Sequence, residues 1–123
     1  MKAIRTEKAP AAIGPYSQGI ESGALVFVSG QIPVDPVTGK IAETIEEQTA
    51  QSLANIENIL AESGLTMADV VKTSVFLADL ADFEAMNRIY AGRFQEPYPA
   101  RSCVQVAAIP KGCRVEIECI AAK

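Results

Sequence analysis

The hydrophobic positions of the chain change their spacing twice, which divides the sequence into strands, helices and strands again. Six segments carry the short apolar or alternating runs that are typical of strands. The run at residues 25–32 is rich in β-branched and aromatic side chains, and it predicts a buried strand. The six predicted strands are residues 3–6, 19–22, 25–32, 70–77, 100–107 and 114–121.

Two further segments have helical spacing. Residues 44–63 carry an apolar stripe and end before Gly64, a residue that commonly terminates helices. Residues 80–94 carry a second stripe, and Asp79 or Asp82 is expected to cap its start. The stripes consist of Ile45, Thr49, Leu53, Ile56 and Leu60 in the first helix, and of Phe83, Met86, Ile89 or Tyr90, and Phe94 in the second.

The order of these elements is strands, helix, strand, helix, strands. This order predicts an α+β fold, in which a mixed six-stranded sheet is covered by two helices on one face. A length of 123 residues fits one domain, so we expect residues 1–123 to share one core.

The last two predicted strands alternate polar and apolar residues in an informative way. Arg101, Cys103 and Gln105 fall on one face of the first, and Glu116 and Glu118 fall on one face of the second. We expect the apolar faces to meet the helices. Arg101 and Glu116 would then share the other face and be neighbours if the two strands pair. That polar face is either open to water or an interface that lines a pocket.

Composition and charge exclude several classes of protein. The chain has no histidine and three cysteines without a CxxC spacing, which excludes an ordinary zinc site and favours free thiols in the cytoplasm. A net charge of −4 argues against a nucleic-acid binder with a basic surface. No apolar run approaches the ~20 residues of a membrane span, and we identify no signal peptide.

The strongest chemical candidate is Arg101, because a guanidinium that is always charged interrupts an apolar strand. Either it pairs with Glu116 or Glu118, or it holds the carboxylate of a ligand through two parallel hydrogen bonds. Glu116 either acts as a general acid/base through a water molecule or is solvated. Cys103 has no histidine to activate it, which favours a structural thiol over a nucleophile.

Two loop features accompany these residues. Gly14 to Gln18 form a turn that presents Tyr16, either as a pocket wall or as a surface ring. Ser29 and Gly30 lie at a strand end, where a ligand can approach the Gly30 N–H; a β-bulge is the alternative.

Taken together, the motifs resemble a known family. The segments that carry the resemblance are Gly-Pro-Tyr-Ser-Gln at 14–18, Val-Ser-Gly-Gln-Ile-Pro at 28–33, Val-Lys-Thr at 71–73, Asp-Leu at 79–80, Phe83, Asn87, Pro-Ala-Arg-Ser at 99–102 and Glu-Ile-Glu at 116–118. In this order they resemble the RidA (YjgF-type) family of enamine/imine deaminases over almost the whole chain. The resemblance implies a fold like the trimeric type of chorismate mutase, with a homotrimer whose active sites lie in clefts between subunits. It implies no cofactor and no metal.

The resemblance also implies a reaction. Members hydrolyse 2-aminoacrylate and 2-aminocrotonate, through their imine tautomers, to 2-keto acids and ammonia, which protects pyridoxal-phosphate enzymes. By this resemblance Arg101 holds the substrate carboxylate with help from the Gly30 N–H. Glu116 and the Cys103 carbonyl position the attacking water. Tyr16 and Ser29 line the pocket, and Asn87 is assigned to structure.

One departure and two alternatives accompany this hypothesis. The loop from Gln95 to Tyr98 is short for the family, so the preferred substrate size is open. One alternative is a regulatory protein that binds a small carboxylate with the same Arg101. The other is the endoribonuclease or translation-inhibitor role attributed to some members, against which the acidic charge balance argues.

Overall fold

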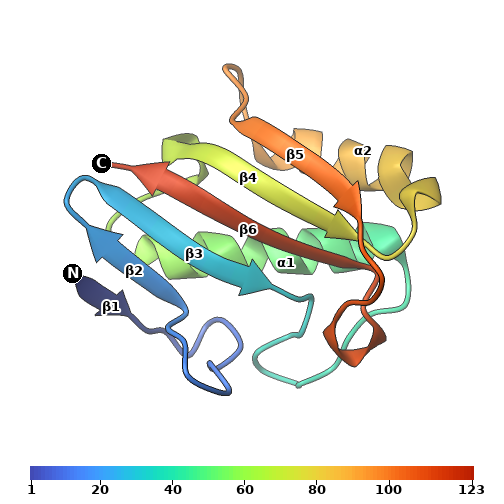
Figure 1. Cartoon of the computed structure of the whole chain (residues 1–123), viewed down its shortest axis with the longest axis horizontal. Helices are drawn as coiled ribbons and strands as arrows, with labels where there is room; N and C mark the ends of the chain where they lie inside the picture. The colour runs from blue at the N-terminus through green and yellow to red at the C-terminus, as the bar shows by residue number, and fades with distance from the viewer.

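The computed structural model describes all 123 residues, and its elements follow the order that the hydrophobic pattern predicts (Figure 1). The strands are β1 (Lys2–Ile4), β2 (Gly19–Ser22), β3 (Leu25–Gln31), β4 (Val70–Leu77), β5 (Ala100–Gln105) and β6 (Val115–Ala122). The helices are α1 (Ile45–Ala61) and α2 (Phe83–Arg93), and short 3-10 turns lie at Met67–Asp69, Leu80–Asp82 and Pro110–Gly112.

All six strands form one sheet in the order β1-β2-β3-β6-β4-β5. The β4–β5 pair is parallel and every other pair is antiparallel. Both helices lie behind this sheet in Figure 1, so one face is covered and the other is open. The predicted α+β architecture is therefore confirmed.

The helix ends follow from local hydrogen bonds. Thr44 caps α1, since its Oγ1 accepts the Glu47 N–H at 3.1 Å. Gly64, with φ of 71°, ends the helix as predicted, and its N–H donates to the Ala61 carbonyl at 3.0 Å. Of the two aspartates expected as caps before α2, Asp79 accepts the Ala81 N–H at 2.8 Å, at the start of the 3-10 turn that precedes the helix.

The core lies between α1 and the sheet. Leu53, Ile56 and Leu60 of the predicted stripe are fully buried in one cluster with Val75 and Ile117 of the central strands. The two central strands, β6 and β4, are thereby fixed by packing on one face and by neighbours on both edges.

The structure corrects the expected neighbourhood of Arg101 and Glu116. Strands β5 and β6 do not pair, because β4 lies between them. The connection through α2 returns the chain parallel to β4, so β5 occupies the outer edge and β6 takes the other edge of β4.

The expected facing of β5 is also wrong. Arg101 and Cys103 lie beside Thr73 and Val75 in the parallel register, and both of those β4 residues are fully buried on the helix side. Glu116 lies beside Phe76, on the open side. The reversal is possible because β5 is an edge strand, where α2 covers the sheet only in part and a long polar side chain still reaches solvent.

The open face of the sheet carries apolar side chains without a covering layer. Leu25 and Phe27 alternate with the buried Val26 and Val28, and they are 40% and 42% exposed. On β5, Val104 is 47% exposed. A row of this kind across one sheet is typical of a surface that another polypeptide covers. Neither helix is long and apolar enough to cross a membrane.

Candidate active site

Four of the six predicted site residues surround one hollow on the open face of the sheet. Tyr16, Ser29, Gly30 and Glu116 all line a cavity of about 670 Å³. The other lining residues are Ile13, Ile32, Pro110, Lys111 and Glu118. The hollow therefore joins three regions of the sequence that the motif analysis singled out separately.

Gly30 lies against the side chain of Glu116. A Cβ placed on Gly30 would lie 2.7 Å from Glu116 Oε2 and 3.0 Å from its Cδ. The strand register is also irregular between Val28 and Gln31, so the β-bulge considered for this segment is present. Bulge and glycine together let the backbone approach the carboxyl group of Glu116.

Glu116 is the residue of this hollow whose pKa is shifted. Partial burial raises the pKa of its carboxyl above the ordinary range, and repulsion from Glu118 adds to the effect. The Glu116 side chain takes part in none of the ion pairs of the chain. A carboxyl group with a raised pKa and no ion partner is a candidate for proton transfer.

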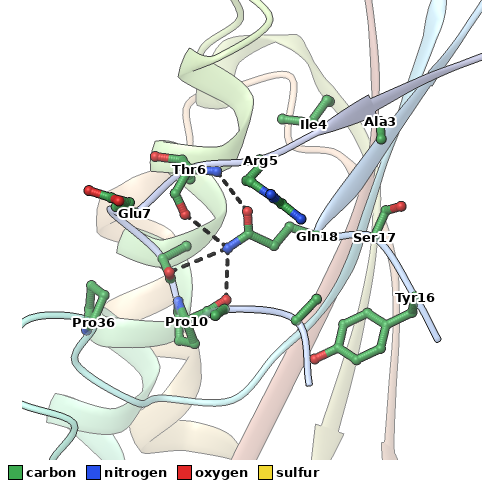
Figure 2. A pocket seen from close by; sticks show the side chains of 13 residues that line it. Ala3, Ile4, Arg5, Thr6, Glu7, Pro10, Tyr16, Ser17, Gln18 and Pro36 are labelled. Atoms are coloured by element: carbon green, nitrogen blue, oxygen red, sulfur yellow. Dashed lines mark hydrogen bonds between the residues drawn. The ribbon is translucent and has the colours of Figure 1, made fainter. Parts of the chain in front are cut away.

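The loop that carries Tyr16 is fastened at both ends. At one end, the buried Gln18 amide accepts the Thr6 N–H at 2.8 Å and donates to three backbone carbonyls between Thr6 and Pro10, at 2.8 to 3.3 Å (Figure 2). At the other end, Ser29 Oγ donates to the Ser17 carbonyl at 2.6 Å. The Ser29 hydroxyl is thus engaged in holding this loop.

One of these bonds explains where the first strand ends. The predicted strand included Thr6, but the Thr6 N–H donates to Gln18, so β1 ends at Ile4.

Tyr16 is 52% exposed, and its hydroxyl accepts the Ile13 N–H at 3.4 Å, a long bond. A second cavity, of about 460 Å³, lies between the loop and β1 (Figure 2). Tyr16 borders both cavities, as the wall that the sequence analysis considered.

Arg101 lies apart from this hollow, on the helix side of β5. Its Nη1 donates to Asn87 Oδ1 at 2.7 Å. The guanidinium carbon lies 4.8 Å from the ring centroid of Tyr90 and 5.5 Å from that of Phe83. Tyr90 is itself anchored through its hydroxyl, 2.7 Å from Thr73 Oγ1. The side chain is therefore held by one hydrogen bond and two cation–π contacts.

No carboxylate of the chain neutralises Arg101. The ion pairs within 4.0 Å are Arg88–Glu46, Arg93–Glu57, Arg114–Asp82 and Lys123–Glu21. The structural pairing of Arg101 with Glu116 or Glu118, one of the two sequence interpretations, is therefore absent. A half-buried and oriented guanidinium without a counter-ion is a ready site for an anion.

Cys103 follows Arg101 on the same side of β5. Partial burial raises the pKa of its thiol, while the nearby Arg101 charge partly opposes that rise. A thiol with a raised pKa and no neighbouring base is a poor nucleophile, which agrees with the structural interpretation of this side chain. The chain has no group of three or more Cys, Asp or Glu side chains arranged to hold a metal ion.

The support of Arg101 is the part of the site that sequence reasoning misses. It assigns Asn87 to structure and treats Phe83 and Tyr90 as one apolar stripe. Their spacing of four and then three residues places all three on one side of α2. An asparagine within a stripe that faces a strand arginine is the signal that would have identified them.

Comparison with known proteins identifies relatives of this chain. A family profile described as Endoribonuclease L-PSP matches residues 6–123. A 2-iminobutanoate/2-iminopropanoate deaminase of Salmonella typhimurium is 52% identical over 99% of this chain and 98% of its own length. The chloroplastic Reactive Intermediate Deaminase A of Arabidopsis thaliana is 55% identical over 96% of this chain and 64% of its own length.

Solved structures show the same similarity. RidA from an Antarctic Psychrobacter species superposes with a TM-score of 0.97 at 46% identity, over 100% of both chains. Escherichia coli TdcF with bound serine superposes with a TM-score of 0.95 at 45% identity, over 100% of this chain and 99% of the other. The chain therefore belongs to the RidA-type family described as Endoribonuclease L-PSP, as its motifs predicted.

Proposed function

We propose that the protein is an imine deaminase that converts 2-aminoacrylate and 2-aminocrotonate, through their imine tautomers, to 2-keto acids and ammonia. The observation that carries this proposal is Arg101, a held guanidinium without a counter-ion. A small 2-imino acid supplies the missing carboxylate. The names of relatives at about 50% identity, 2-iminobutanoate/2-iminopropanoate deaminases, support the same substrate class.

The site is proposed to form between copies of the chain. Arg101 points to the helix side at the edge of the sheet, while Glu116 points to the open side and is separated from β5 by β4. One small substrate cannot contact both side chains of a single copy. A homotrimer would bring Arg101 and Cys103 of one copy to Tyr16, Ser29, Gly30 and Glu116 of the next, and would cover the exposed apolar row of Leu25, Phe27 and Val104.

The chemistry needs few groups. The guanidinium of Arg101 and the Gly30 N–H bind the substrate carboxylate, and the imine carbon is thereby oriented. Glu116 and the Cys103 carbonyl hold a water molecule, and Glu116 takes its proton as the oxygen adds to that carbon. Glu116 gives that proton to the imine nitrogen, which forms a carbinolamine. Glu116 then transfers a second proton, from the carbinolamine hydroxyl to the nitrogen, so that the C–N bond breaks, ammonia leaves and the keto group forms. The raised pKa of Glu116 suits both transfers.

The protein is proposed to act as one domain over residues 1–123, in the cytoplasm, where its three cysteines stay free. Small imines already hydrolyse in water, so orientation and a placed water molecule are sufficient for a useful rate.

A coupled assay tests the proposal. A threonine dehydratase releases the imine in the presence of semicarbazide, which traps it, and the protein competes with the trap. We expect less semicarbazone with wild type and no reduction with Arg101→Ala, while both keep the same mass in solution. An active and folded Arg101→Ala variant would refute the assigned role of Arg101, and a wild-type monomer would refute the shared site.

Two other functions are weighed by the same experiment. The Escherichia coli relative solved with bound serine favours a second candidate, a regulatory protein that binds a small carboxylate. Binding of 2-ketobutyrate without turnover of any imine would support it. An endoribonuclease role, named in the family description, is disfavoured by the net charge of −4.

A further inference from the structure

Lys111 has a backbone conformation that lysine rarely adopts. It is the only residue other than glycine with a positive φ, at 59°, and Gly112 follows with φ of 66°. The turn is closed by the Gly112 N–H, which donates to the Ile109 carbonyl at 3.1 Å. Glycine or asparagine is favoured at such a position, so a lysine there invites a search for what its side chain does.

The turn places Lys111 at the candidate site. In Figure 1 this turn, Pro110–Gly112, lies in the connection that precedes β6. Lys111 lines the 670 Å³ hollow together with Gly30, Glu116 and Glu118, and it is the only cationic residue among the nine that line it. It also lines an adjoining cavity of about 250 Å³ that includes Gly30, Ile32 and Asp35.

The charge of Lys111 is free. It takes part in none of the four ion pairs, and its side chain is exposed. Its field acts on Cys113, a buried neighbour two positions along the chain. The pKa of the buried Cys113 thiol is raised by burial first and by Glu116 second, and Lys111 opposes that rise. The charges of Lys111 and Glu116 thus act on the same small volume.

The positive charge of Lys111 opposes the negative charge of the glutamates in the hollow. Two glutamates line the hollow, and both repel a substrate that carries a carboxylate. A neutral imine of the same size meets no such repulsion. A cation at the rim reduces the repulsion for anions without occupying the place of Arg101, and it does so before the substrate reaches the guanidinium.

We propose that Lys111 is a specificity-determining residue, which favours the entry of imines that carry a carboxylate over neutral imines. The proposal rests on the proposed function, since it concerns the substrate of the same site. The turn with the rare φ places this one cation in the lining of the hollow, and an uncharged residue that tolerates the turn would lose the preference.

Four proteins test the proposal: wild type, Lys111→Asn, Lys111→Arg and, as a matched control, Lys2→Asn. Asparagine tolerates the positive φ but has no charge, and arginine keeps the charge. Lys2 is an exposed lysine on β1 and does not line the hollow. Its replacement therefore changes the net charge by the same amount as Lys111→Asn, but at a different place. The substrates are 2-iminobutanoate and the imine of its neutral carboxamide, each at ~20 mM and ~500 mM ionic strength.

We expect Lys111→Asn to lower kcat/KM for 2-iminobutanoate about threefold to tenfold at low salt, with little effect at high salt. The carboxamide imine should be unaffected, Lys111→Arg should keep most of the preference and Lys2→Asn should match wild type. An active wild type with the same preference in Lys111→Asn would overturn the role of Lys111 alone. A wild type that hydrolyses neither imine would overturn the proposed function and this inference with it.

Discussion

Asn87 Oδ1 accepts a hydrogen bond of 2.7 Å from Nη1 of Arg101, across the gap between α2 and the edge strand β5. The amide oxygen orients the guanidinium without neutralising it. A carboxylate in the same place would hold the arginine equally well but would remove its attraction for a second anion. The amide of Asn87 therefore leaves the charge of Arg101 available to bind an anionic ligand.

Replacing Asn87 tests this distinction directly. We expect Asn87→Ala to raise KM for 2-iminobutanoate about tenfold, because the arginine loses its orientation. Asn87→Asp should raise it further, toward a hundredfold, because the new carboxylate forms an internal ion pair that competes with the substrate. The semicarbazide trapping assay gives KM, and calorimetry with 2-ketobutyrate gives the matching loss of affinity.

The control for Asn87 is the neighbouring Arg88 on the same helix. Its side chain is 66% exposed and pairs loosely with Glu46, at 3.9 Å. Arg88→Ala should leave KM unchanged, since exposed pairs contribute little. An Asn87→Asp protein with the KM of wild type would contradict the role of Arg101 as the carboxylate clamp.

Cys103 should contribute to the reaction through its backbone and not through its thiol. Partial burial raises the thiol pKa, so little thiolate exists at neutral pH. We expect Cys103→Ser to keep kcat within about threefold of wild type, whereas loss of a true nucleophile lowers kcat by up to a millionfold. Steady-state kinetics decide between the two, and a loss of several orders of magnitude in a folded variant would restore the nucleophile hypothesis.

Glu116 should lower stability at neutral pH while it supports catalysis. Its folded pKa is raised above the ordinary value of 4.5, so the folded state binds the proton more tightly than the unfolded state. Stability attributable to Glu116 is therefore present below pH ~4.5 and falls as pH rises toward the folded pKa. We expect Glu116→Gln to be inactive, yet more stable at pH ~7 by less than about 1 kcal/mol, because solvent screens the half-exposed carboxylate.

Urea unfolding of wild type and of Glu116→Gln between pH ~4 and pH ~7 measures this difference in stability. The stability difference should vanish toward pH ~4, where the glutamate is protonated in both states. A Glu116→Gln variant that is less stable at pH ~7 would show that the carboxylate makes a stabilising contact instead.

Glu118 should influence the acid limb of the pH–rate profile. Its charge is the second cause, after burial, of the raised Glu116 pKa. Glu118→Gln should lower that pKa and shift the acid limb of kcat/KM to lower pH, since the base form of Glu116 then persists further into acid. An unmoved acid limb would mean that Glu116 is not the group that titrates in the rate.

The fold was predictable because its elements have strong local signals. The stripe on α1, the stop at Gly64 and the apolar run of β3 each agree with the structure to within a few residues. Which side chains of β5 face the helices was not predictable from periodicity, since alternation gives two faces but does not say which of them a helix covers. The position of β4 between β5 and β6 follows from the crossover through α2, a relation that no single segment encodes.

The site was predictable in part for a similar reason. Motifs identified Tyr16, Gly30 and Glu116, and the hollow collects all three. They identified Arg101 too, but its placement on the other side of the sheet depends on strand order. Lys111 had no signal in the sequence, because a positive φ is a property of the folded turn.

The contact between Gly30 and Glu116 gives the last prediction. In Gly30→Ala the new Cβ would lie 2.7 Å from Glu116 Oε2, so the carboxyl group must move. We expect the variant to lose most of its activity but at most about 1 kcal/mol of unfolding free energy, because the displaced atom is the end of a flexible side chain. Thermal unfolding and the trapping assay measure the two effects.

Gly92→Ala is the matched control, because Gly92 lies in α2 and a Cβ added there would meet no heavy atom within 4 Å. It should be neutral or more stable by about 0.5–1 kcal/mol, with unchanged activity, since alanine favours a helix interior. Shortening the displaced side chain should also help, so Gly30→Ala combined with Glu116→Asp should be more stable than Gly30→Ala alone. If Gly30→Ala keeps full activity, the carboxyl group does not need its present position, and Glu116 cannot be the residue that places the water.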